Sequence, residues 1–471
     1  MIWDLQKYRD NIAVLDEYGI SLTYGALEEE GRRAAEAIGR RSLAFILCRN
    51  ETGALVGYTG MMNAGVVPLL LNSHMDRNAL AGLLDAYQPP HLWAPEDMAD
   101  GFPDCTPVYR AFGYCLLRRQ CKTEYPLHPD LALLLTTSGS TGSRKFVRQS
   151  CANIKSNAES IVRYLELDET ERPITTLPMN YTYGLSIINS HLLVGATLLI
   201  TDKSLTQKEF WQFFRQREAT SFGGVPYTYE MLDRMRFQRM KLPSLRTMTQ
   251  AGGKLLPELH KRFAEYAAEN GINFVVMYGQ CEATARMGYL PADRALEKCG
   301  SMGVAIPGGS FQLLGADGQV IRDPHVTGEL VYQGPNVTLG YAESGEDLAK
   351  GDERHGILET GDMAQFDEDG YYYIVGRKKR FLKIYGNRVN LDEIDQLVKA
   401  QFAQTDFVSA GVDDHMYLFI TDSSVAGAVK EFVVTKTGLN PAAFKTVFLN
   451  EIPKNDSGKT LYTELRKYYK E

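Results

Sequence analysis

Glycines, hydroxyl side chains and one lysine are concentrated in the segment TTSGSTGSRKF (136–146). Glycines leave backbone N–H groups free to approach an anion, and serine and threonine hydroxyls add further donors. The segment directly follows an apolar run, LALLL (131–135), so a phosphate-binding loop after a buried strand is the natural interpretation. It is not a Walker A motif, because Gly139 and Gly142 are three residues apart and Lys145 lies three residues further on.

A second lysine of interest lies in NDSGKT (455–460), near the end of the chain. This segment ends like a nucleotide-binding P-loop, but a Walker A motif would require glycine at position 453, where the chain has Pro453. Only eleven residues follow Thr460, too few for the strands and helices of a P-loop domain. The segment is therefore better interpreted as a glycine-containing turn that presents Lys459.

The elements expected to position these residues alternate between helices and apolar strands. The pattern predicts a helix over 21–40, a strand over 43–48, a helix over 50–65 and a strand over 66–72. Later apolar segments that continue this alternation are 173–178, 196–201, 244–253 and 272–279. Continuous apolar strands that alternate with helices predict an α/β fold with parallel sheets buried on both faces.

The sequence pattern changes after about residue 300. Short alternating strands with Gly, Asp and Pro turns over 308–341 suggest an antiparallel barrel or meander. The last ninety or so residues then suggest a small α+β unit that follows a linker. We therefore expect an N-terminal core over 1–379 and a small C-terminal cap over 380–471.

Composition excludes several classes of partner. The chain has 471 residues and a net charge of −7 without a long basic block, which argues against nucleic acid as the main partner. Its seven cysteines form no CxxC pair, a pattern typical of reduced thiols in a cytoplasmic enzyme. The longest apolar stretch, LLVGATLLI (192–200), is too short to span a bilayer.

The glycine-rich loop resembles the [ST]-S-G-[ST]-T-G-x-P-K motif of the adenylate-forming (AMP-binding) superfamily, which contains acyl-CoA and aryl-CoA synthetases. Other segments resemble the later motifs of this superfamily in the correct order. They are LPMNYTYGLS (177–186), GGVPYTYEML (223–232), TQAGGKLL (249–256), VVMYGQCEATARMGYLP (275–291), the TGD…GRKK…EID block (358–395) and IPKNDSGKTLYTEL (452–465). Each motif alone is weakly specific, whereas the ordered set is very specific.

The resemblance implies a MgATP site. Its phosphate loop would use Thr137, Ser138, Gly139, Ser140, Thr141, Gly142 and Lys145. A Gly252–Gly253 turn would lie against the adenine, with Tyr278 stacked on the base beside Gly279 and with Cys281 near the AMP phosphate. Glu282 would be the Mg²⁺ ligand, since Mg²⁺ bound to ATP takes a hard carboxylate. Asp362 would accept hydrogen bonds from the ribose hydroxyls, and Arg377 would donate to the ribose or phosphates.

The resemblance also implies a reaction in two halves. A carboxylate attacks the α-phosphorus of MgATP and releases pyrophosphate, and a thiol of coenzyme A or phosphopantetheine then attacks the acyl-adenylate. Lys459 would be the catalytic cation that reduces repulsion between the two anions of the first half. The cap would rotate between the halves and bring KIYGNRV (383–389), including Gly386, towards the thiol arm.

The chain departs from the family pattern at several positions. Arg144 replaces a proline and Cys281 replaces a threonine, which weakens a hydrogen-bond donor beside Glu282. Tyr181 lies where many relatives have histidine, and Tyr462 lies where arginine is frequent. Arg380 occupies the hinge position, where it is expected to be polar and flexible.

The acyl pocket is expected to include Asn180, Tyr181, Tyr183 and Gly184. This region has no carboxylate that could pair with an α-ammonium group, so an amino acid is disfavoured, and a small polar, hydroxy- or aryl acid is left open. The acceptor, free CoA or a carrier protein, is left open as well. Two alternative functions on the same fold are a luciferase-like oxygenase, which no residue supports, and a weakly active or non-catalytic nucleotide-binding scaffold.

Overall fold

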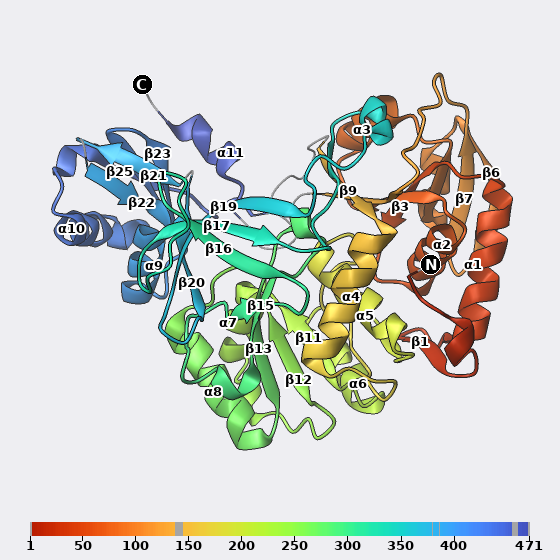
Figure 1. Cartoon of the computed structure of the whole chain (residues 1–471), viewed down its shortest axis with the longest axis horizontal. Coiled ribbons are helices and arrows are strands. Elements are labelled where there is room, and N and C mark those ends of the chain that lie inside the picture. Colours follow the sequence, from red (N-terminus) through yellow and green to blue (C-terminus); the bar gives the residue numbers. More distant parts are fainter. Residues whose placement is uncertain (1, 137–144, 379, 386, 455–459, 470–471) are drawn as a thin grey trace.

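The computed structural model describes residues 2–136, 145–378, 380–385, 387–454 and 460–469. The fold is α/β, as the sequence predicts, and contains three larger sheets and three smaller ones in the described residues. Figure 1 shows the N-terminal sheet at one side of the molecule, the central helices and second sheet beside it, and the C-terminal unit at the opposite side.

The N-terminal sheet has eight strands in the order β18-β9-β8-β4-β3-β5-β7-β6. The strands β8, β4, β3 and β5 are parallel, whereas β9, β18, β7 and β6 are antiparallel to their neighbours. The bounds are β3 (Leu43–Cys48), β4 (Val67–Asn72), β5 (His91–Pro95), β6 (Cys105–Ala111), β7 (Tyr114–Arg119), β8 (Leu131–Thr136), β9 (Phe146–Ser150) and β18 (Gly340–Ala342). A short sheet of β10 (Leu198–Ile200), β1 (Ile12–Asp16) and β2 (Ser21–Thr23) lies outside it.

The second sheet has the order β11-β12-β13-β14-β15, of which the first three strands are parallel. Its bounds are β11 (Ser221–Gly224), β12 (Thr247–Gln250), β13 (Asn273–Tyr278), β14 (Gly288–Leu290) and β15 (Val304–Ala305). The segment 173–178, which was expected to be a strand, forms only isolated bridges to Ser221 and Leu199. Pro173 and Pro178 have no N–H groups to donate to a ladder, which explains the difference.

The helices of the large part cover both sheets. They are α1 (Tyr24–Ile38), α2 (Thr52–Asn63), α3 (Arg77–Tyr87), α4 (Cys151–Leu165), α5 (Thr182–Leu193), α6 (Lys208–Gln216), α7 (Pro226–Arg234) and α8 (Pro257–Asn270). The predicted helix over 21–40 is α1, which begins where Thr23 accepts a hydrogen bond from the N–H of Ala26 and ends at Gly39 in the left-handed region. In Figure 1, α4 and α5 lie between the two large sheets.

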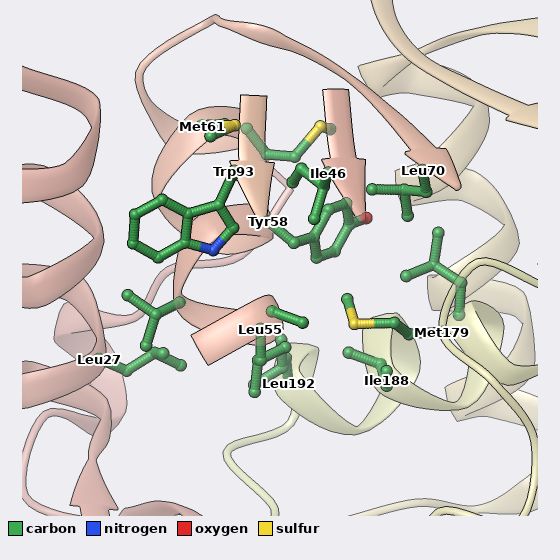
Figure 2. Close-up of a cluster of buried hydrophobic side chains, with 14 of the residues drawn as sticks. Leu27, Ile46, Leu55, Tyr58, Met61, Leu70, Trp93, Met179, Ile188 and Leu192 are labelled. Atoms are coloured by element: carbon green, nitrogen blue, oxygen red, sulfur yellow. The ribbon is translucent and has the colours of Figure 1, made fainter. Parts of the chain in front are cut away.

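Helix α2 is buried on all sides and joins the N-terminal sheet to α5. Leu55, Tyr58 and Met61 of α2 pack in one cluster with Ile46 of β3 and Ile188 of α5 (Figure 2). The continuous apolar character of both β3 and α2 matches this position, since each element has buried neighbours on two faces. Packing of α5 on this core fixes the helix whose first turn reaches the candidate site.

The strands between residues 310 and 377, apart from β18, form an open, four-stranded antiparallel sheet in the order β16-β17-β19-β20. Its bounds are β16 (Ser310–Leu314), β17 (Gly328–Gln333), β19 (Ile357–Phe366) and β20 (Tyr372–Arg377). The expected barrel-like part is therefore a meander: the strands pair in an open row, and no closing pair joins β16 to β20 among the described residues.

The C-terminal segment has its own two apolar clusters, whose buried members all lie between Leu382 and Leu465. Its elements are β21 (Phe381–Ile384), β22 (Asn387–Asn390), α9 (Leu391–Gln401), β23 (Phe407–Val412), β24 (His415–Ile420), α10 (Ala426–Thr437), β25 (Phe444–Phe448) and α11 (Tyr462–Leu465). The strands β23, β24 and β25 form a sheet. Helices α9 and α10 contact each other and pack against β23 and β25, respectively.

Candidate active site

The predicted nucleotide-binding residues come from the ends of strands in different sheets. Strand β8 ends at Thr136, immediately before the glycine-rich loop, and β13 ends at Tyr278. The loop residues predicted to bind phosphate (Thr137, Ser138, Gly139, Ser140, Thr141 and Gly142) lie outside the described residues, as do Arg144, Gly386 and the predicted catalytic Lys459. The other predicted residues are described and fall into three groups.

The first group is centred on the buried carboxylate of Asp362, whose side chain is 6% exposed. Tyr278 Oη donates to Asp362 Oδ2 over 2.5 Å, and Gln280 Nε2 donates to the same oxygen over 2.9 Å. Arg377 Nε lies 3.2 Å from Asp362 Oδ1. The arginine is opposite the aspartate because β19 and β20 pair Asp362 with Arg377. The structure thus brings together Tyr278, Asp362 and Arg377 as the motifs predict.

The phenol of Tyr278 is held in its protonated form. Burial raises the pKa of Tyr278 well above its usual range, and the adjacent Asp362 carboxylate raises it further. Tyr278 therefore remains a donor to Asp362 over the physiological range. Its ring packs edge-on against Phe311, with ring centroids 6.3 Å apart. Gly279 follows, and an added Cβ there would lie 1.7 Å from the carbonyl oxygen of Ala285, so only glycine fits.

The second group joins Glu282 to Lys145 through Tyr341. Tyr341 lies on β18, beside β9, and its Oη donates to Glu282 Oε1 over 2.7 Å. The ammonium of Lys145 lies 3.9 Å from the centroid of the Tyr341 ring and 3.7 Å from Glu343 Oε1. Burial and the neighbouring Glu282 raise the pKa of Tyr341 to about 12, so this phenol also remains a donor.

The backbone around Glu282 is firmly held. Its carbonyl oxygen accepts hydrogen bonds from Thr338 Oγ1 and from Arg354 Nη1, both over 2.9 Å. Thr284, two residues on, has a positive φ of 66°, a conformation that a β-branched residue rarely adopts. Its hydroxyl donates to the carbonyl of Asn336, which holds the turn in place. Cys281 is 1% exposed, so its predicted contact with an AMP phosphate stays a prediction.

A Mg²⁺ ion bound to ATP suits this second group. Mg²⁺ usually binds nucleotides through one or two protein carboxylates together with phosphates and waters. Glu282 supplies one oriented carboxylate, with Oε1 held by Tyr341. The described residues contain no cluster of three or more potential metal ligands.

The third group lines the predicted acyl pocket. Tyr181 and Tyr183 belong to an apolar cluster with Val225, Ala251 and Met277. Gly252 has a φ of 84°, and an added Cβ there would lie 2.7 Å from Tyr181 Oη. The glycine turn predicted to face adenine therefore lies directly against the pocket tyrosine, and Gly253 follows it. Tyr183 shares a hydrogen bond of 2.7 Å with Thr249 Oγ1.

The remaining two pocket residues occupy the entrance to α5. Asn180 is half-buried just before the helix, and Gly184 lies in its first turn. A Cβ at Gly184 would lie 2.4 Å from the carbonyl oxygen of Pro178, so the close approach of the two segments depends on glycine. The hydroxyl of Thr182 donates to the carbonyl oxygen of Thr284, which ties the pocket segment to the turn after Glu282.

Arg286 is a buried cation that the sequence analysis did not single out. It is 3% exposed, and its guanidinium lies 5.2 Å from the centroid of the Tyr183 ring. Nε donates to Ser186 Oγ over 3.1 Å, and Nη1 donates to Tyr164 Oη and Met277 Sδ, both over 3.0 Å. No carboxylate of the described residues lies within ion-pair distance of Arg286. A buried cation with only neutral partners is electrostatically suited to receive an anion.

The base of the segment that carries Lys459 lies near the acyl pocket. Lys454 and Thr460 form an isolated antiparallel bridge, and the N–H of Leu461 donates to the carbonyl of Pro453 over 2.8 Å. Lys454 Nζ lies 5.9 Å from the centroid of Tyr227, in the first turn of α7. The C-terminal unit thus places this turn beside the large part, next to the segment that contributes Val225 to the pocket.

Arg380, expected to be a flexible hinge residue, is instead anchored. Nε lies 2.8 Å from Asp392 Oδ1, and Nη2 lies 2.8 Å from Asp395 Oδ2. The guanidinium also lies 4.3 Å from the centroid of the Tyr462 ring. These contacts all go to α9 and α11, so the arginine side chain belongs to the C-terminal unit. The two acids that bind it could not be paired with it from the sequence alone.

Comparisons with known proteins agree with this arrangement. The sequence model of the family described as AMP-binding enzyme matches residues 2–342. The chain is 30% identical over 352 residues to an oxalate–CoA ligase of Arabidopsis thaliana, covering 72% of this chain and 67% of that protein. It is 27% identical over 451 residues to a 2-succinylbenzoate–CoA ligase of Bacillus cereus, covering 92% and 90%.

The chain belongs to the AMP-binding enzyme family. A solved o-succinylbenzoate CoA synthetase of Bacillus subtilis, in complex with an acyl-adenylate, shares the fold with a TM-score of 0.78 at 22% identity, over 99% of this chain and 98% of that one. The family match and the relatives named as CoA ligases indicate an AMP-forming acid–CoA ligase. No helix in the described part of the chain is long and apolar enough to cross a membrane.

Proposed function

We propose that the chain converts a small carboxylic acid with a second acidic group to its CoA thioester, using the three groups of residues described above. The observation that carries the proposal is the convergence of the Asp362 group, the Glu282–Tyr341–Lys145 group and the buried Arg286. The first two match a nucleotide and its phosphates in charge, and the third offers a positive charge inside the acyl pocket.

In this proposal, Asp362 accepts hydrogen bonds from the ribose hydroxyls. A carboxylate has about four lone-pair sites, of which Tyr278, Gln280 and Arg377 use three in the structure. Arg377 is 60% exposed, so its guanidinium can also reach a phosphate while it pairs with Asp362. Tyr278 contributes its ring to the adenine site, with the Gly252–Gly253 turn opposite it.

The phosphate end of the nucleotide is proposed to lie over Tyr341. Lys145 and the glycine-rich loop 137–144 hold the phosphates, and Glu282 holds the Mg²⁺ that neutralises part of their charge. Lys459 supplies the cation between the attacking carboxylate and the α-phosphate, delivered by the turn that begins at Lys454. Positioning and charge neutralisation provide most of the catalysis in reactions of this type.

Arg286 supports an acid that carries a second anionic group. When one carboxylate of the substrate reaches the α-phosphate, the far end of the molecule lies among Tyr181, Tyr183 and Met277. A carboxylate or sulfonate there would pair with the guanidinium, whose present partners are neutral. Oxalate, sulfoacetate and 2-succinylbenzoate, named for three relatives, each have two acidic groups. Indoleacetate, named for a fourth, has one, so the proposal depends on Arg286 itself.

We also propose free CoA as the acceptor. The curated relatives reported above are named as CoA ligases, and one of them matches 92% of this chain. The cap over 380–471 is proposed to rotate between the two half-reactions and to bring the turn between β21 and β22 towards the thiol. The anchoring of Arg380 to α9 suggests that this rotation occurs on the N-terminal side of that arginine.

Product analysis tests this proposal. The chain is incubated with MgATP, CoA and a panel of paired acids, such as succinate with butyrate and 2-succinylbenzoate with 4-oxo-4-phenylbutyrate, and acyl-CoA and AMP are measured by chromatography. We expect AMP and acyl-CoA in equal amounts, with the diacid of at least one pair preferred. AMP formation without thioester, restored by a phosphopantetheinylated carrier protein, would contradict CoA as the acceptor.

A cytoplasmic location is part of the proposal. All seven cysteines are free thiols in the structure, which suits a reducing compartment. Fractionation of the source cells, followed by immunodetection, tests the location. Recovery in a membrane-bounded oxidising compartment would contradict it.

A further inference from the structure

A cavity in the described part of the N-terminal unit lies at the edge of the sheet opposite the active site. It has a volume of about 700 Å³, within the usual range for small-molecule sites. Leu43 begins β3 and His91 begins β5, and both residues line the cavity. Strand β8 runs in the same direction and ends at Thr136, before the phosphate loop. The cavity and the loop are therefore at opposite ends of the parallel strands.

The cavity lining is strongly basic in a chain of net charge −7. The lining contains four arginines (Arg40, Arg41, Arg118 and Arg119) and one carboxylate, that of Glu124. Arg40 pairs with Glu124 over 2.7 Å. Arg118 and Arg119 make only long hydrogen bonds, of 3.3 to 3.5 Å, to carbonyl and amide oxygens. These two guanidiniums have no carboxylate partner among the described residues.

Two buried polar side chains in the same lining have no hydrogen-bond partner in the described structure. Both ring nitrogens of His91 and the hydroxyl of Ser42 are without partners, and the residues are 6% and 5% exposed. Buried polar groups are normally satisfied, so unpaired groups that line a cavity indicate a missing ligand or water. Burial and the nearby Arg118 and Arg40 lower the pKa of His91 to about 4, so the neutral ring offers one donor and one acceptor.

We propose that this cavity binds a phosphate monoester with an apolar body, as a second site separate from the active site. Arg118 is suited to hold the phosphate, because its partner across β7 and β5 is His91, which puts the two side chains on one face of the sheet, and guanidinium groups bind phosphate oxygens in a bidentate manner. His91 and Ser42 contribute hydrogen bonds to the ester. Tyr87, Pro90 and Leu348 provide apolar walls for the attached group.

Hydrogen bonds connect the cavity to the strand that leads into the phosphate loop. Arg41 in the lining donates to the carbonyl oxygens of His128 over 2.9 Å and of Leu131 over 2.7 Å. Leu131 begins β8, the strand that leads into the loop. A ligand that draws Arg41 towards its phosphate would compete with these hydrogen bonds at the start of β8.

Calorimetric titration with phenyl phosphate tests the proposal. The titration is made in the presence of saturating AMP, so that the active site is occupied. We expect one binding site with a Kd below 1 mM (an affinity better than about −4 kcal/mol), and at least tenfold weaker binding of phenylacetate. Arg118→Gln should weaken binding of phenyl phosphate at least tenfold. Arg110→Gln should not change the affinity for phenyl phosphate. This variant removes an exposed arginine of the neighbouring strand β6, which is paired with Glu96.

A measurement on the unmodified protein guards against misfolding of the Arg118→Gln variant. The pKa of His91 is followed by NMR with and without phenyl phosphate, with the signal assigned by His91→Asn. A bound dianion should raise this pKa towards its ordinary value. The proposal is overturned by an absence of saturable binding, by equal binding of phenylacetate, or by a His91 pKa that phenyl phosphate does not move.

Discussion

Asp362 is the residue on which the proposed nucleotide site depends most directly. It accepts hydrogen bonds from Tyr278 and Gln280, at and just after the end of β13, and forms an ion pair with Arg377 of β20 in another sheet. The sequence motif predicts Asp362 and Arg377, and the strand register explains why they meet. Gln280 was not predicted to take part, although it lies inside the quoted motif, because a neutral amide carries no chemical signal without a known neighbour.

The first prediction concerns Asp362→Asn. The variant should bind AMP about 10- to 100-fold more weakly, because an amide loses the charge and turns a donor towards Gln280 or Arg377; hydrogen bonds to charged groups contribute roughly 1.5–3 kcal/mol. Calorimetry measures the Kd. Asp367→Asn is the matched control, since Asp367 is equally buried but binds Lys298 and Tyr373 instead. Equal loss in both variants would show a folding defect, and no loss in Asp362→Asn would contradict the ribose contact.

The second prediction concerns Arg286. Arg286→Met should reduce kcat/KM for the preferred diacid by roughly 100-fold, because truncation of one partner of a buried charge pair costs about 2–5 kcal/mol. The matched monoacid should lose much less, since it has no group to pair with the guanidinium. Steady-state thioester formation gives both values, and Arg286→Lys should restore part of the diacid activity. If the ratio of kcat/KM for the diacid to kcat/KM for the monoacid is the same in Arg286→Met as in the wild type, Arg286 serves packing alone.

At the scale of elements, strand pairing decides how the site residues meet, and the sequence predicts pairing only in part. The apolar runs at 43–48 and 66–72 correctly predict parallel strands, since they are buried on both faces. The antiparallel strands β9 and β18 could not be placed, because their order depends on contacts between residues about 190 positions apart. Tyr341 lies near Glu282 and Lys145 because β18 pairs with β9, and no local sequence pattern identifies this tyrosine.

The C-terminal unit makes a third prediction, on pH. Burial raises the pKa of Asp395 to about 6, although Arg380 and Ser409 act in the opposite direction. Between about pH 4 and 6, Asp395 is therefore protonated in the folded state and ionised in the unfolded state. Because the folded state binds the extra proton, the free energy of unfolding falls as the pH rises through this window. The contribution of Asp395 to this fall is roughly 3 kcal/mol at most. Above pH 6 the ionised carboxylate pairs with Arg380.

Asp395→Asn tests this assignment, because asparagine can still accept the hydrogen bonds of Ser409 but cannot titrate. The difference in unfolding free energy between the wild type and this variant should change with pH between 4 and 6 and be constant above pH 7. Urea unfolding monitored at several pH values gives this difference. A difference that does not depend on pH would mean that Asp395 has an ordinary pKa.

On the scale of the whole molecule, the structure places the turn that precedes Lys459 beside α7 and the acyl pocket. The small C-terminal unit agrees with the expected fold, whereas the assignment of Lys459 to a turn other than a P-loop stays a prediction. The orientation of that unit could not be predicted, because it depends on sparse surface contacts such as that between Lys454 and Tyr227. Lys459 itself lies outside the described residues.

The fourth prediction separates the two half-reactions. Lys459→Ala should reduce acyl-adenylate formation by at least 100-fold, since removal of one preorganised electrostatic group costs about 2.7–4 kcal/mol in comparable sites. Thioester formation from a supplied acyl-adenylate should be retained. Lys436→Ala removes a lysine of α10 in the same unit and should affect neither half strongly. Equal loss of both halves in Lys459→Ala would contradict a rotating cap.

The most direct test of the proposed adenylation site is acid-dependent exchange of labelled pyrophosphate into ATP, measured with the paired acids in the presence of Mg²⁺ and the absence of CoA. We expect exchange that requires an acid, is faster with the diacid of the preferred pair, and falls in Asp362→Asn but not in Asp367→Asn. An absence of exchange with every acid, in a protein that still binds ATP, would contradict the account and would instead support a non-catalytic nucleotide-binding protein.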